Sequence, residues 1–166
     1  MEQLFKKLSK FLEYTLIVIF LVLVIDVLWQ VIARYGKINS GFTEELSRFL
    51  LIWLSILATA YSRSYKGQMA IDFVYAKLSQ ANKYRISLFI EICIILFAFF
   101  VMIVGGLNLM YITLKLKQLS PSLNWPVGIV YSVVPISGLL IVFFSCYHIR
   151  TYQQNRTTFL SSKSSH

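Results

Sequence analysis

Four long runs of apolar residues, separated by shorter polar segments, dominate the hydropathy pattern of this chain. They cover approximately residues 11–33, 44–62, 86–114 and 126–148. Because about 20 apolar residues suffice for a helix to cross the hydrocarbon core of a bilayer, each run is long enough to span. The pattern predicts an all-α integral membrane protein with four transmembrane helices, forming one membrane domain over residues 1–150. The polar composition that follows predicts a disordered tail over residues 151–166.

A fifth segment, about residues 69–83, has apolar and polar residues that repeat with the period of a helix. Ile71, Val74 and Leu78 fall on one helical face, whereas Asp72 and Lys83 fall on the other. The segment is too short and too polar to cross a bilayer. We therefore expect an amphipathic interfacial helix between the second and third transmembrane helices, lying in the plane of the membrane surface.

Polar residues gather on one face near the far end of the first apolar run. Asp26, Gln30 and Arg34 follow one another at four-residue intervals, so a helix places them on the same side. Polar and ionisable groups at membrane depth are costly when they face lipid. This face is therefore expected to pack against protein and not against lipid.

Three charged residues open the second apolar run at the same membrane level. Glu44 and Glu45 both lie within reach of Arg48, at i, i+4 and i, i+3 spacing. If the first two helices are antiparallel neighbours, Arg34 can pair with Glu44 or Glu45, and Asp26 can pair with Arg48. Two interpretations remain open: an ion pair at a helix end, or a cluster that docks onto another protein chain.

The last two apolar runs contain residues that shape helices and helix contacts. Gly105 and Gly106 in the third run permit close approach of a neighbouring helix. Pro126 suits the first turn of the fourth run, and Pro135 is expected to bend it. Glu91 is the charged residue inside the apolar part of the third run.

Composition and charge exclude a soluble protein and fix an orientation. With 57% hydrophobic residues and a mean hydropathy of +0.68, a soluble domain could not bury so much apolar surface. The formal charge of +9 comes from basic residues that flank the apolar runs, so membrane topology explains it and no nucleic-acid partner is expected.

Eleven of the sixteen Lys and Arg residues fall on the side of the two termini, four fall on the opposite side, and Arg48 is intramembrane. Both termini are therefore predicted to be cytoplasmic.

The sequence offers little support for an enzyme. His148 and His166 have no partner at ligand spacing, which argues against a zinc or haem site. Cys93 and Cys146 lie inside apolar runs without a CxxC pattern. No nucleophile elbow or phosphate-binding loop occurs. Two functions remain: a membrane subunit whose polar residues face a partner, and a self-sufficient four-helix exporter that works as a homodimer.

Three segments of the chain resemble a known family. They are Thr-Glu-Glu-Leu-Ser-Arg-Phe-Leu-Leu-Ile-Trp at residues 43–53, the stretch 63–72, and the stretch 120–138 with its Ser-Pro-Ser and Pro-Ile-Ser-Gly elements. Together they resemble the small membrane subunit (DctQ-like, Q subunit) of tripartite ATP-independent periplasmic (TRAP) transporters. The Glu-Glu-Leu-x-Arg element with its later Trp53 is the most specific part. Phe42 and Gln68 depart from the family, which often has Trp and His at these places.

The resemblance implies a multi-pass protein of the bacterial inner membrane that acts as a scaffold in a symport system. Its implied partners are a large membrane subunit, which would carry the substrate and sodium sites, a periplasmic substrate-binding protein, and membrane lipid. The substrate would be an organic acid of the dicarboxylate or sialic acid type, and no cofactor is expected in this subunit. The residues expected at the partner interface, or in a structural role, are Asp26, Gln30, Arg34, Glu44, Glu45, Arg48, Trp53, Asp72 and Pro135.

Overall fold

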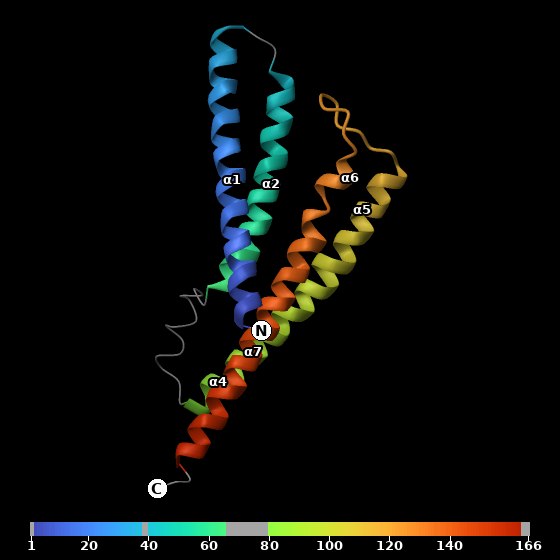
Figure 1. The fold of residues 1–166 in the computed structure, drawn as a ribbon. Helices are drawn as coiled ribbons and strands as arrows, with labels where there is room; N and C mark the ends of the chain where they lie inside the picture. Colours follow the sequence, from blue (N-terminus) through green and yellow to red (C-terminus); the bar gives the residue numbers. More distant parts are fainter. Residues whose placement is uncertain (1, 38–39, 66–79, 164–166) are drawn as a thin grey trace.

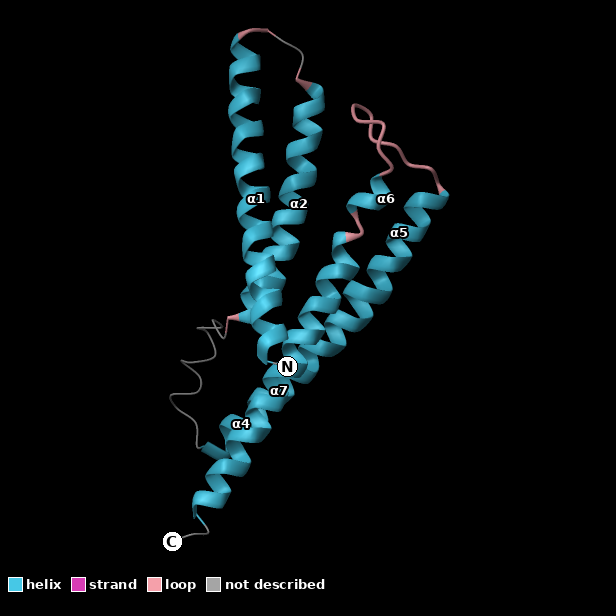
Figure 2. Cartoon of the chain, in the orientation of Figure 1, coloured by secondary structure: helices cyan, strands magenta, loops and turns pink. Residues whose placement is uncertain are grey.

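The computed structural model describes residues 2–37, 40–65 and 80–163, and these ranges contain helices joined by loops and turns, with no strand (Figures 1 and 2). The elements in chain order are α1 (Glu2–Tyr35), α2 (Gly41–Ser64), α4 (Gln80–Phe97), the π-helix η1 (Ala98–Gly105), α5 (Gly106–Lys115), α6 (Val127–Val130) and α7 (Val133–Lys163). The all-α prediction is confirmed for the described ranges. Most of the predicted interfacial helix, with Asp72, lies outside them, and residues 80–83 form the start of α4.

Helices α1 and α2 form an antiparallel pair joined by a short connection (Figure 1). Helix α1 begins at Glu2, well before the apolar run, so the basic lead-in is helical too. Lys6 pairs with Glu2 one turn earlier, at 2.7 Å between Nζ and Oε1, which supports this first part of the helix. Toward the ends of α1 and α2 that are joined to each other, this pair diverges from α5, α6 and α7 (Figure 1). An apolar cavity of about 380 Å³ lies between α2 on one side and, on the other, α6 with the loop before it.

The third apolar run is one continuous helical rod built from α4, η1 and α5. Its middle part packs against α7, where glycines permit close approach. A Cβ on Gly138 would lie 2.9 Å from the Cβ of Met102, and one on Gly106 would lie 3.0 Å from the Cδ of Pro135. The predicted close contact is therefore confirmed at Gly106. At Gly105 the nearest atom is the carbonyl oxygen of Phe100 in the same rod, at 3.6 Å.

The fourth apolar run is broken near its start. Helix α6 ends at Val130 and α7 begins at Val133. Pro135 explains the break, because it lacks an N–H and its ring clashes with the carbonyl of Tyr131 four residues earlier. Beyond the predicted span, α7 continues to Lys163, so residues 151–163 are helical where the sequence predicted disorder. No Gly or Pro follows Gly138 to end the helix.

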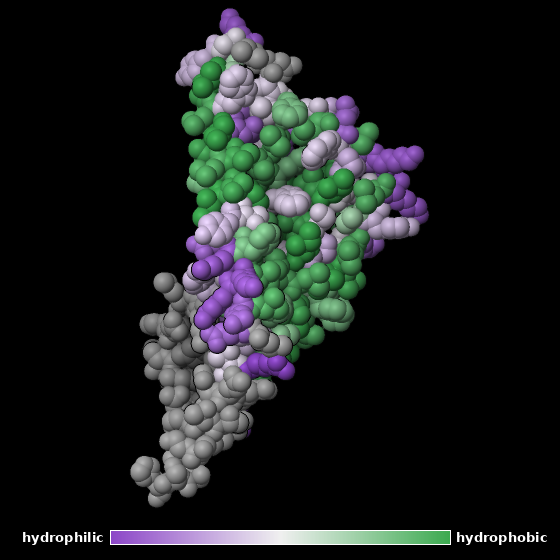
Figure 3. Space-filling model, in the orientation of Figure 1, coloured by the Kyte–Doolittle hydropathy of each residue, from purple (hydrophilic) through white to green (hydrophobic). Residues whose placement is uncertain are grey.

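Among the residues that the structure describes, three helical stretches are long and apolar enough to cross a bilayer: Glu2–Tyr35, Arg85–Lys115 and Val127–Thr151. Helix α2 has 24 residues and is about 36 Å long, but it also carries four charged side chains. The fourth span therefore stays a prediction. The described bundle has a core of Leu12, Leu57, Val133 and Phe144 from α1, α2 and α7, and its outer surface shows a broad apolar belt (Figure 3).

Candidate functional site: two sets of buried polar contacts

The first set of polar contacts joins α1 to α2 through Gln30. The Nε2 atom of Gln30 lies 2.8 Å from Oδ2 of Asp26, 3.0 Å from the carbonyl oxygen of Thr43 and 3.0 Å from Oγ of Ser47. Asp26 is buried, with 7% of its surface exposed. The predicted polar face is therefore turned toward α2 at Asp26 and Gln30, whereas Arg34 is exposed.

The ion pairs that the sequence allows between these two helices do not form. Within the described ranges, ion pairs join Lys6 to Glu2 and place Glu91 beside both Arg63 and His148. Antiparallel packing brings the polar residues to one level, but the rotation of each helix decides which of them meet. Gln30 occupies the position beside Asp26 that was one of the possible positions for Arg48. Together with Arg34, the side chains of Glu44 and Arg48 lie exposed on the bundle surface.

Glu45 connects α2 to the loop that follows α5. Its Oε2 atom accepts hydrogen bonds from the backbone N–H groups of Ser122, at 2.8 Å, and Leu123, at 3.0 Å. Two adjacent backbone donors in a turn form a ready binding place for a carboxylate. Glu45 is thus bound to the loop and not to Arg34 or Arg48.

Trp53 connects α2 to the break between α6 and α7. The carbonyl of Val130 would normally accept a hydrogen bond from the N–H of Val134, but that N–H bonds to Tyr131 at 3.1 Å instead. The indole Nε1 of Trp53 donates to the Val130 oxygen at 3.1 Å and satisfies the freed acceptor. Farther along, the hydroxyl of Ser137 donates to the carbonyl of Ile56 at 3.0 Å.

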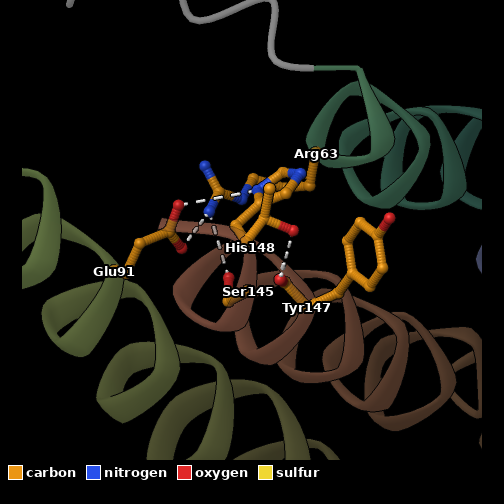
Figure 4. A network of polar contacts seen from close by, with 6 residues as sticks. Arg63, Glu91, Ser145, Tyr147 and His148 are labelled. Carbon is orange, nitrogen blue, oxygen red and sulfur yellow. Dashed lines mark hydrogen bonds and ion pairs between the residues drawn. The ribbon is translucent and has the colours of Figure 1, made fainter. Parts of the chain in front are cut away.

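The second set is a buried network at the other end of the bundle (Figure 4). Arg63 of α2 donates to the Glu91 carboxylate of α4 and to Oγ of Ser145 of α7, the latter at 3.0 Å. The Nδ1 atom of His148, also on α7, lies 3.6 Å from Oε1 of Glu91. All four residues are at most 9% exposed. A single carboxylate is therefore shared by three helices.

Sequence reasoning missed this network. In the sequence, Arg63 directly follows the second apolar run and is one of the eleven basic residues on the side of the termini, and His148 has no partner at ligand spacing. Two signals were available: Glu91 is an acid inside an apolar run and therefore needs a partner, and Ser145 and His148 are three residues apart on one helical face. What the sequence does not contain is the packing that brings α2 and α4 against the same side of α7.

The polar residues of both sets hold helices to one another. In the described part of the chain, no group of three His, Cys, Asp or Glu side chains is arranged to hold a metal ion. The polar groups bind one another across α1, α2, α4 and α7 and leave one buried guanidinium atom, Nε of Arg63, without a partner among the described residues.

Comparisons with known proteins agree with the sequence resemblance. Residues 22–154 match the family model described as tripartite ATP-independent periplasmic transporters, DctQ component. The chain is 30% identical over 143 residues to a putative TRAP transporter small permease protein of Haemophilus influenzae, covering 85% of this chain and 86% of that protein. It is 28% identical over 136 residues to the isethionate TRAP transporter permease protein DctMQ of Oleidesulfovibrio alaskensis, covering 80% of this chain. The match spans only 21% of the length of DctMQ. The chain therefore belongs to the DctQ family and is a small permease subunit of a TRAP transporter.

Proposed function

We propose that this subunit is a fixed scaffold for the large membrane subunit of a sodium-coupled, binding-protein-dependent importer of organic acids. The observation that carries the proposal is the use of its polar side chains. Gln30, Glu45, Trp53 and Arg63 each tie one helix or loop to another within the bundle. Such contacts between helices suit a rigid support. In this proposal, the substrate and sodium sites belong to the large subunit.

The large subunit as partner is supported by the DctMQ relative. The name DctMQ combines the letters M and Q, and the part of that protein that resembles this chain is 21% of the DctMQ length. We infer that the remainder corresponds to the large subunit, and that this chain binds an equivalent protein. Its contact surface would include the exposed charges Arg34, Glu44 and Arg48. The substrate class remains an organic acid, of the dicarboxylate or sialic acid type, delivered by a periplasmic binding protein.

The proposed setting is the bacterial inner membrane, with α2 as a fourth span and both termini in the cytoplasm. The asymmetric distribution of Lys and Arg supports this orientation. Reporter fusions at Lys66 and Gln118 should report opposite compartments, cytoplasmic and periplasmic. The same compartment for both would contradict the proposed topology.

Reconstitution in liposomes tests the scaffold function. The chain together with its large subunit and binding protein should show sodium-dependent uptake of an organic acid. The chain alone should show no solute flux above that of empty vesicles, because the polar groups buried inside the bundle are engaged in contacts between its helices. Saturable flux from the chain alone would contradict the scaffold proposal and support the homodimeric exporter.

A further inference from the structure

A cavity of about 600 Å³ lies between the first turns of α1 and the end of α2. Lys6, Lys7 and Lys10 line it from α1, and Tyr65 lines it from the residue after α2. In Figure 3, the hydrophilic surface at this end of the bundle borders the apolar belt directly. The cavity therefore lies where a membrane-embedded helix changes from apolar to basic.

The cavity carries an excess of positive charge. Lys6 is paired with Glu2, but Lys7 and Lys10 form no ion pair with any residue that the structure describes. The acid in the lining is Glu13, which leaves more ammonium groups than carboxylates around the space. An anionic group is the ligand that this charge favours.

An exposed apolar strip continues from this cavity along α1. Phe11, Tyr14, Val18 and Leu21 follow Lys7 at alternating four- and three-residue spacing, so they share one helical face. Their exposed fractions are 66%, 68%, 58% and 54%. A soluble anion would use the basic cavity alone. A ligand with both an anionic head and long apolar chains would fill the cavity and cover the strip.

We propose that this cavity binds the phosphate headgroup of an anionic phospholipid, with its acyl chains lying along the Phe11–Leu21 strip. Lys7 and Lys10 supply the positive charge that attracts the phosphate. The site belongs to the leaflet that surrounds the first turns of α1, whichever side of the membrane that is. Lipid binding at this site does not depend on the proposed scaffold function.

Lipid binding can be measured on the purified full chain in detergent by native mass spectrometry. The probes are phosphatidylglycerol, phosphatidylcholine with the same acyl chains, and soluble glycerol 3-phosphate. We expect saturable binding of phosphatidylglycerol, with weaker binding of the other two. Removing both charges in Lys7→Ala/Lys10→Ala should weaken phosphatidylglycerol binding by roughly tenfold or more, because each basic residue near an anionic lipid surface contributes a factor of about five.

A control variant separates a specific site from diffuse attraction. Lys115→Ala/Lys117→Ala removes the same charge from two exposed lysines, one at the end of α5 and one two residues later, and should leave binding unchanged. Equal losses in the two double variants would overturn the proposal. Glycerol 3-phosphate binding as tightly as the lipid would also overturn it, in favour of a soluble phosphate ligand.

Discussion

Arg63 of α2 and Glu91 of α4 form an ion pair inside the bundle, although 28 residues separate them in the sequence. Their side chains are only 10% and 8% exposed. Helix α7 packs against both α2 and α4, and its Ser145 and His148 complete the surroundings of the pair. The end of α2 and the start of the third apolar rod are thus fixed to one another through a charge contact that water does not screen.

Replacing Glu91 should strongly destabilise the bundle. Glu91→Gln leaves the Arg63 charge buried without a counter-ion, and breaking a buried pair in this way costs about 3 to 5 kcal/mol. The measurement is the free energy of unfolding of the purified chain in detergent, with exposed Glu44→Gln as the matched control. A double variant, Arg63→Met/Glu91→Leu, should recover most of the loss because both charges are gone. Equal stability of Glu91→Gln and Glu44→Gln would show that the pair does not hold the helices together.

Gly138 should not tolerate even one added methyl group. In Gly138→Ala the new Cβ would meet the Cβ of Met102 at 2.9 Å and the carbonyl oxygen of Ala98 at 3.3 Å, and neither is the flexible end of a side chain. We expect a loss of about 1 to 3 kcal/mol, the usual cost of overpacking. Gly105→Ala is the control, since its Cβ would find its nearest atom at 3.6 Å. The same unfolding measurement would contradict the close η1–α7 contact if both variants were equally stable.

Loss of the Glu45 carboxylate should release the loop after α5. Glu45→Ala removes the acceptor for the backbone N–H groups of Ser122 and Leu123. A reporter cysteine, Ser122→Cys, should then react severalfold faster with a membrane-impermeant thiol reagent. Glu44→Ala is the matched control because it removes the neighbouring carboxylate, which is exposed. Unchanged labelling rates in the Glu45 variant would mean that other contacts hold the loop.

The sequence predicted the features that depend on local pattern. Long apolar runs predicted the helices, and four-residue spacing predicted that Asp26 and Gln30 face protein, because both follow from helix geometry. The partners of charged residues were harder to predict. The hypothesis of an Asp26–Arg48 pair was wrong because membrane level does not determine helix rotation. The contact between Arg63 and Glu91 depends on tertiary packing around α7, which no local pattern contains.

Arg48 is predicted to bind the large membrane subunit. It is exposed on α2, next to apolar residues, and forms no ion pair with the described residues. An ionisable group at membrane depth is costly unless it is paired or faces protein, so we expect its partner on another chain. Arg48→Ala should weaken the association with the large subunit roughly thirtyfold or more, measured by co-purification, since truncating one side of a buried interfacial charge pair costs about 2 to 5 kcal/mol.

Two further variants define what Arg48 does. Lys37→Ala removes a charge from the connection between α1 and α2 and should leave co-purification unchanged. Arg48→Lys keeps the charge but loses the planar guanidinium, so partial loss of co-purification would indicate a bidentate carboxylate partner. Substrate uptake in cells should fall in parallel with assembly. If Arg48→Ala assembles and transports like the unmodified protein, Arg48 is a surface charge at a helix start, and the interface with the large subunit lies elsewhere on the bundle.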